Sequence, residues 1–238
     1  MIDFSDLMDK SPEFDLTTLL EAGCHFGHQS KRWHPKMGEW IYMEKNGVHI
    51  FDLVKTASQM KLAYNYAYKL GKENKVLVFV ATKKQAKEVV RQEAERVGAM
   101  FVTSRWLGGI LTNWEQVKKS IKRMLDIQEG LKSGKFSKYT KYEQLQLEKE
   151  ANRLERFFGG IKSLKDMPDA LFIVDPNREK VAIKEANLVN LSVMALVDSN
   201  CDPRKVDLVI PANDDALKSI SIIVKAVADG YEAGKKDR

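Results

Sequence analysis

The sequence predicts an α/β protein built on a doubly wound parallel β-sheet, and two observations support this fold class. Five short apolar runs, rich in β-branched residues, are typical of strands buried on both faces. Amphipathic stretches with apolar residues three and four positions apart lie between most of them, so helices would cover both faces through right-handed crossovers. The expected strands are 76–81, 99–102, 170–174, 193–197 and 208–210, and the expected helices are 55–70, 83–97, 179–188 and 214–231.

A small β-hairpin is expected before this sheet. Its strands would be residues 40–43 and 48–50, which flank the dipeptide Asn46-Gly47. Asn-Gly favours the tight two-residue turn that joins antiparallel strands. The hairpin would therefore lie between an N-terminal helical extension and the first strand of the parallel sheet.

Residues 112–158 interrupt the alternation, because they contain no strand candidate and two helical runs separated by Gly130 and Gly134. We expect a coiled-coil hairpin inserted into a sheet domain made of residues 1–111 and 159–238. Apolar residues at approximately coiled-coil spacing would pack the two arms together. They are Val117, Ile121, Met124 and Leu131 on the first arm, and Tyr142, Leu145, Ala151 and Leu154 on the second.

Composition narrows the class of protein. The 238 residues include 44% hydrophobic side chains, enough for one sizeable core. No apolar run reaches the roughly 20 residues of a membrane span, and the acidic N-terminus does not look like a signal peptide, so we expect a cytoplasmic protein with no membrane partner. Cys24 and Cys201 are too few for a disulfide framework and are interpreted as reduced thiols.

Positive charge is concentrated in one segment. Residues 118–141 carry eight lysines and arginines and two carboxylates, so the net charge of this segment is +6. That value equals the formal net charge of the whole chain. Such a block favours a polyanionic partner. The alternative is an exposed helix face that is simply solvated by water.

The segment Cys24–Met37, with the sequence CHFGHQSKRWHPKM, combines the residue types that bind RNA. Cationic side chains can neutralise phosphates, and the aromatic and imidazole rings offer flat faces to unstacked bases. A loop between two buried elements collects the same residues, so composition alone leaves both interpretations open.

Ligands of an open parallel sheet bind beyond the carboxyl ends of its strands. After the first two strands come Thr82-Lys83-Lys84 and the segment 103–106, which ends in Arg105-Trp106. These cations near helix starts favour anions. The later strand ends are acidic instead, with Asp175, Asp198, Asp202, Asp214 and Asp215. Caps and turns account for such residues in many proteins, and a protein partner or a cation is the alternative.

Catalytic motifs are missing from the sequence. It contains no dinucleotide-binding G-x-G-x-x-G after a strand, no phosphate loop and no nucleophile elbow. A zinc site would need paired ligand spacing, which is absent among Cys24, His25, His28 and Cys201, so we expect no metal. Because the motifs above are missing, we also expect no cofactor and no small-molecule substrate. Two other classes stay open at this point: a nucleotide- or metal-dependent enzyme on a Rossmann-like sheet, and a module that dimerises through its coiled coil.

Five segments follow one another in order along the chain: TLLEAGCHFGHQSKRWHPKM, FVATKKQAKEVV, SRWLGGILTNW, PDALFIVDPNRE and LVDSNCDPRKVDLVIPANDDALKSI. Together they resemble the bacterial-type small-subunit ribosomal protein S2 family. The chain departs from the family pattern at Leu191-Ser192 and at Pro211-Ala212. The resemblance implies a flavodoxin-like sheet domain with an inserted coiled coil and a structural, non-catalytic role in translation. The implied partners are small-subunit ribosomal RNA and neighbouring ribosomal proteins, including the mRNA-binding protein S1.

These arguments together give two sets of expected contact residues. We expect the cations to contact RNA phosphates and the rings to pack on sugars or bases. The RNA-binding set is Lys31, Arg32, Trp33, His34, Lys36, Lys83, Lys84, Arg105, Trp106, Lys132, Lys135 and Lys138, and the protein-partner set is Asp198, Asp202, Asp214 and Asp215.

Overall fold

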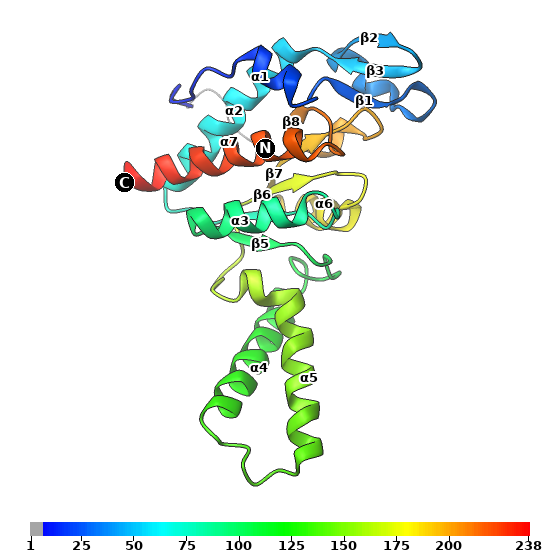
Figure 1. Ribbon diagram of the computed structural model, residues 1–238. Coiled ribbons are helices and arrows are strands. Elements are labelled where there is room, and N and C mark those ends of the chain that lie inside the picture. The colour runs from blue at the N-terminus through cyan, green and yellow to red at the C-terminus, as the bar shows by residue number, and fades with distance from the viewer. Residues whose placement is uncertain (1–6) are drawn as a thin grey trace.

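Five parallel strands form the central sheet in a computed structural model of the chain, which describes residues 7–238 (Figure 1). The strands are β4 (Leu77–Val80), β5 (Met100–Val102), β6 (Ala170–Val174), β7 (Ser192–Val197) and β8 (Leu208–Pro211). Their spatial order is β5-β4-β6-β7-β8. Counted from the first strand this is 2-1-3-4-5, the order of flavodoxin-like sheets. All five predicted strands are confirmed, with ends shifted by about one residue at most.

Helices cover both faces of this sheet, as the alternating pattern predicts. Because successive side chains of a strand point to opposite faces, Leu77 and Phe79 pack into the core beneath α2 (Leu53–Lys72), α3 (Lys87–Val97) and α7 (Leu217–Lys236). Val78 and Val80 belong to the second core, which α6 (Lys180–Leu188) covers. The doubly wound α/β architecture is therefore confirmed.

Two helices begin later than predicted. The bounds are α3 (Lys87–Val97) and α7 (Leu217–Lys236). Residues 83–86 form a turn that directs Lys83 toward the strand ends, and the carbonyl oxygen of the Asn213 side chain accepts hydrogen bonds from the backbone of Asp215 and Ala216. Local side-chain hydrogen bonds of this kind compete with the first helical turn.

A second sheet of three antiparallel strands lies at the other end of the molecule from α4 (Trp114–Lys132) and α5 (Lys141–Phe158) (Figure 1). It contains β1 (Phe26–Gln29), β2 (Ile41–Lys45) and β3 (Val48–Phe51) in the order β1-β3-β2. Asn46 and Gly47 have φ of 54° and 74°, which a type I′ turn requires. The predicted hairpin is confirmed, whereas β1 was not predicted. The remaining elements are α1 (Leu16–Glu21), η1 (Ser30–Arg32), η2 (Pro35–Trp40), η3 (Gly159–Ile161) and η4 (Pro203–Lys205).

Helices α4 (Trp114–Lys132) and α5 (Lys141–Phe158) pack side by side and extend away from the sheet (Figure 1). Ile121 and Met124 are buried, in agreement with the predicted apolar positions of the first arm. The prediction for the second arm is wrong at Tyr142 and Leu145, whose exposed fractions are 70% and 46%. Coiled-coil packing and the division into two domains stay predictions. Among residues 7–238, no helix has both the length and the apolar character needed to cross a membrane.

Candidate functional site

The carboxyl ends of four parallel strands meet in a group that we call the sheet-edge cluster. It consists of Lys83, Asp175, Asp198, Asp214, Asp215 and His28. The lysine follows β4, and the four aspartates follow β6, β7 and β8. His28 comes from β1 of the other sheet. The cluster therefore brings together residues that are far apart in sequence, as expected for the carboxyl edge of a parallel sheet.

Lys83 lies inside this cluster and is unavailable to phosphate. Its Nζ is 2.6 Å from Asp214 Oδ1, 2.7 Å from Asp215 Oδ1 and 3.8 Å from Asp175 Oδ2, and the residue is only 9% exposed. Although burial opposes the charged form, the nearby carboxylates raise the pKa of Lys83 above its usual value. The expectation that Lys83 contacts RNA is therefore wrong. Its charge neutralises buried carboxylates instead.

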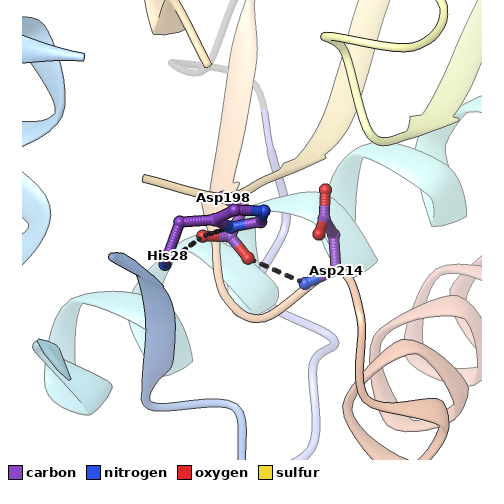
Figure 2. A group of neighbouring side chains, drawn as sticks. All are labelled: His28, Asp198 and Asp214. Carbon is purple, nitrogen blue, oxygen red and sulfur yellow. Dashed lines mark hydrogen bonds and ion pairs between the residues drawn. The ribbon is translucent and has the colours of Figure 1, made fainter. Parts of the chain in front are cut away.

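His28 is joined to Asp198 by side chain and backbone. The imidazole Nδ1 lies 2.9 Å from Asp198 Oδ1, and the backbone N–H donates to Ser199 Oγ at 2.8 Å. Figure 2 shows the imidazole extending over Asp198 toward Asp214. Gly27 permits this approach, because a Cβ there would stand 2.9 Å from Ser199 Oγ. Segment 23–28 thus packs on the ends of β7 and β8.

Burial and mutual repulsion change the protonation of the cluster. Burial, reinforced by the charges of Asp198 and Asp175, raises the pKa of Asp214 to about 7. The hydrogen bond to Asp198 raises the pKa of His28 above its usual 6.5. Both shifts have the same consequence, since each makes the folded protein hold a proton more tightly.

Three side chains of the sheet-edge cluster, those of His28, Asp198 and Asp214, offer atoms that could bind a metal ion. One ligand atom each from His28, Asp198 and Asp214 lies within 4.8 Å of the others, and Asp214 Oδ2 is buried with no hydrogen-bond partner among residues 7–238. An imidazole nitrogen with carboxylate oxygens is a donor set that suits Zn²⁺ and related divalent ions. Sequence spacing could not reveal this group, because its members lie on β1 and after β7 and β8. Our expectation of no metal rested on that spacing alone.

The cationic part of segment 24–37 lies at the surface, in what we call the cationic loop (residues 31–36). Lys31, Arg32 and Lys36 are exposed, and the part of the chain that the structure describes offers them no ion-pair partner. Trp33 is 39% exposed, with its ring centroid 4.8 Å from that of His49. His34 anchors the loop by donating its backbone N–H to the carbonyl of Ser199 at 2.7 Å.

The segment after β5 divides into one exposed and one buried residue. Arg105 is exposed, as is Lys84 after β4. Trp106 is 6% exposed and its Nε1 lies 3.4 Å from Glu185 Oε1, so the expectation that it packs on RNA is wrong. Buried Glu185 also accepts hydrogen bonds from the backbone N–H groups of Gly109 at 2.7 Å and Leu111 at 2.9 Å. Sequence reasoning missed Glu185, because it sits on the buried side of α6 as an ordinary helical residue.

The four aspartates predicted to hold a protein partner differ in access. Asp198 and Asp214 are 1% and 0% exposed, so they cannot contact a partner without rearrangement and that expectation is wrong for both. The Asp202 side chain is 17% exposed and caps η4, while that of Asp215 is 56% exposed. The interpretation of Asp202 as a cap is therefore confirmed.

A hollow of about 750 Å³ opens beside these strand ends. Lys180, Lys184 and Lys205 contribute to its wall together with His34 and Cys201, and burial raises the pKa of the Cys201 thiol well above its usual value. A thiol with a raised pKa stays protonated and unreactive. Both cysteines are free and buried, in agreement with the interpretation of Cys24 and Cys201 as reduced thiols.

The third predicted group of cations lies between α4 and α5. Lys132, Lys135 and Lys138 are exposed, and within residues 7–238 none of them forms an ion pair. The structure therefore separates the predicted RNA contacts into two exposed groups. One is the cationic loop with Lys84 and Arg105 on the sheet domain, and the other lies at the far end of the helical pair (Figure 1).

Comparison with known families identifies this arrangement. A family model described as Ribosomal protein S2 matches residues 19–234. The chain belongs to the ribosomal protein S2 family. The match covers both sheets and the helical pair, and it confirms the resemblance that the five sequence segments indicate.

Membership in the S2 family makes this chain a small-subunit ribosomal protein with a structural rather than a catalytic role. Its place is in the ribosome. The sheet-edge cluster fits a structural role as well, because its hydrogen bonds join β1 to the ends of β7 and β8 and so fix one sheet against the other.

Proposed function

We propose that this S2-family protein holds small-subunit ribosomal RNA through two separate cationic surfaces, one on the sheet domain and one on a coiled-coil hairpin. The observation that carries the proposal is the state of Lys31, Arg32 and Lys36. All three are exposed, and residues 7–238 provide no carboxylate to pair with them. Free cations held on a rigid surface are the groups that neutralise phosphates and release counterions.

The backbone of the cationic loop is hydrogen-bonded to the strand ends and within the loop itself. His34 donates to Ser199, and the Nδ1 atom of His34 accepts from the backbone of Lys36 at 3.2 Å. Trp33 adds a partly exposed ring beside the cations. Such a combination suits recognition of folded RNA by its backbone and by a few stacked or sugar contacts.

The proposal is tested with a triple variant, Lys31→Gln/Arg32→Gln/Lys36→Gln. We expect the affinity for small-subunit RNA to fall, and the slope of log affinity against log salt to become less negative by about two to three units, one for each lost phosphate contact. The matched control is Lys87→Gln/Arg91→Gln/Lys225→Gln, which removes three cations from helices α3 and α7. Equal slopes in the triple variant and the control would contradict the proposal.

Docking of protein S1 is a further part of the proposal, and the family resemblance is its source. Of the four aspartates considered, Asp215 offers the most accessible carboxylate, with a side chain that is 56% exposed. Asp215→Asn should weaken capture of S1 by small subunits, whereas Asp229→Asn, on α7, should leave it unchanged. Identical capture by both variants would remove Asp215 from the docking site.

A further inference from the structure

The loop that joins α4 and α5 carries more than the predicted lysines. We call residues 132–142 the hairpin tip. It contains four exposed lysines, Lys132, Lys135, Lys138 and Lys141, and no carboxylate occurs between them in the sequence. It also exposes two tyrosines, Tyr139 by 48% and Tyr142 by 70%. Exposed large rings next to unpaired cations are unusual on a surface that only faces water.

Two of the cations nearer the sheet behave differently, because they form ion pairs. In the shafts of α4 and α5, Arg123 pairs with Glu150 at 3.1 Å, and Lys118 lies 3.5 Å from both Glu115 and Asp166. The lysines of the hairpin tip have no such partner among residues 7–238. Attraction for a polyanion is therefore concentrated at the end of the helical pair, since the shafts, residues 114–131 and 143–158, carry seven lysines and arginines against seven carboxylates.

The hairpin tip has a defined conformation. Phe136 packs on Gly130, where a Cβ would stand 2.3 Å from its ring, and its ring centroid lies 5.3 Å from that of Tyr139. The side-chain amide of Gln144 donates to the carbonyls of Phe136 and Tyr139, both at 3.0 Å. A preformed loop loses little conformational entropy when it binds a ligand.

We propose that the hairpin tip is a binding site for an unpaired segment of RNA, in which bases stack on Tyr139 and Tyr142 while the four lysines contact the phosphates. The inference rests on the proposed function and deepens it, because it names the class of RNA that this surface takes. Bases buried in a duplex have no free face to stack on an exposed tyrosine, whereas bases of a loop or bulge do. Lysines alone would not distinguish the two.

The test compares two RNAs with the same number of phosphates. One carries an unpaired purine-rich loop of about eight nucleotides, within the range of site sizes for single-stranded binding, and the other is fully paired apart from a minimal closing loop. Affinities of the full chain are measured at several salt concentrations. The ratio of the two affinities reports stacking, because the lysines act on both RNAs.

We expect the wild-type chain to prefer the looped RNA by on the order of tenfold or more, as stacking of one or two bases predicts. Tyr139→Ala/Tyr142→Ala should lose most of this preference, and Tyr139→Phe/Tyr142→Phe should keep it. The matched control is Tyr42→Ala, which removes a tyrosine that is 72% exposed on β2. Gly130→Ala should also reduce the preference, since the added methyl group displaces Phe136 and with it the loop.

Two results would overturn the inference and leave the proposed function intact. One is equal affinity of the wild-type chain for both RNAs. The other is a preference for the looped RNA that survives in Tyr139→Ala/Tyr142→Ala. If that variant instead loses a protein neighbour from the assembled subunit, the two tyrosines contact protein and not RNA. Absence of binding to either RNA at low salt would overturn the proposed function as well, so the two failures are distinguishable.

Discussion

Lys83 at the sheet edge and the lysines of the hairpin tip carry the same charge in opposite surroundings. Lys83 is 9% exposed and lies within 4.0 Å of three carboxylates, whereas Lys132, Lys135 and Lys138 are exposed and, in the described part of the chain, unpaired. A buried lysine among carboxylates contributes to stability, because its removal leaves buried charges without a partner. An exposed unpaired lysine adds little to stability and is free to bind a phosphate.

The largest difference in stability between the sheet edge and the hairpin tip is expected for the variant Lys83→Met. Removing this charge leaves buried Asp214 without its ion-pair partner, so the free energy of unfolding should fall by about 3 kcal/mol. Urea denaturation monitored by tryptophan fluorescence measures it. The loss should be greater at pH 8 than at pH 5, because Asp214 can take up a proton at the lower pH.

Lys84→Met is the matched control for that change. Lys84 is the next residue, carries the same charge and is exposed, so its removal should alter the free energy of unfolding by less than about 0.5 kcal/mol. Similar losses in the two variants would mean that the contrast between buried and exposed lysines does not govern stability here.

A smaller effect is expected from pH. The pKa of Asp214 rises from 3.8 to about 7 on folding, so its protonated form stabilises the protein at low pH, and this contribution is lost as pH rises from about 4 to 7. His28, whose pKa is also raised, contributes stability below pH 6.5 that is lost as pH rises further. The free energy of unfolding should therefore fall by about 2 to 3 kcal/mol between pH 5 and pH 8.

Asp214→Asn sharpens this prediction. An amide does not titrate, so the variant should show a flatter dependence of unfolding free energy on pH between 4 and 7, whatever its absolute stability. Both proteins are measured with EDTA, which removes any divalent ion that His28 and Asp198 could bind. A slope as steep as that of the wild-type chain would assign the pH dependence to other groups.

The smallest effect on stability is expected at the hairpin tip, where Lys132→Glu/Lys135→Glu/Lys138→Glu should change the unfolding free energy by no more than about 0.5 kcal/mol. Its incorporation into small subunits should nevertheless decrease, because like charges then face the RNA backbone. Reconstitution followed by sedimentation measures incorporation. The control variant Lys118→Glu/Lys119→Glu/Lys122→Glu changes three cations of the α4 shaft. Unchanged incorporation of the tip variant would leave its lysines as a solvated surface.

The central sheet could be predicted from sequence because burial on both faces demands apolar residues at every position of a strand. Leu77–Val80 and Ala170–Val174 satisfy that demand and were recognised. Strand β1 was missed for the converse reason. It is short, its exposure pattern is mixed, and its backbone hydrogen bonds go partly to Asp198 and Ser199 rather than to a strand.

The candidate site was predicted less well, because the fate of a polar residue depends on neighbours that are distant in sequence. Trp106 follows a polar stretch that ends in an arginine, and a residue at such a position could equally face solvent. In the structure, however, its indole N–H donates to Glu185, which lies 79 positions further along the chain. Lys83 and Lys84 are adjacent and chemically identical, and only the position of Asp214 decides which of them is buried.

The sequence by itself determined the α/β fold class, the net charge of +6 and the ordered motifs of the S2 family, since each depends on residue types and their spacing along the chain. Only the tertiary structure decided which charges are neutralised. It placed Lys83 within 2.6 Å of Asp214, 131 positions away, and, among residues 7–238, left the lysines of the hairpin tip without an ion-pair partner. Electrostatic energy depends on distance in space and on the local dielectric. Neither quantity is encoded in spacing along the chain.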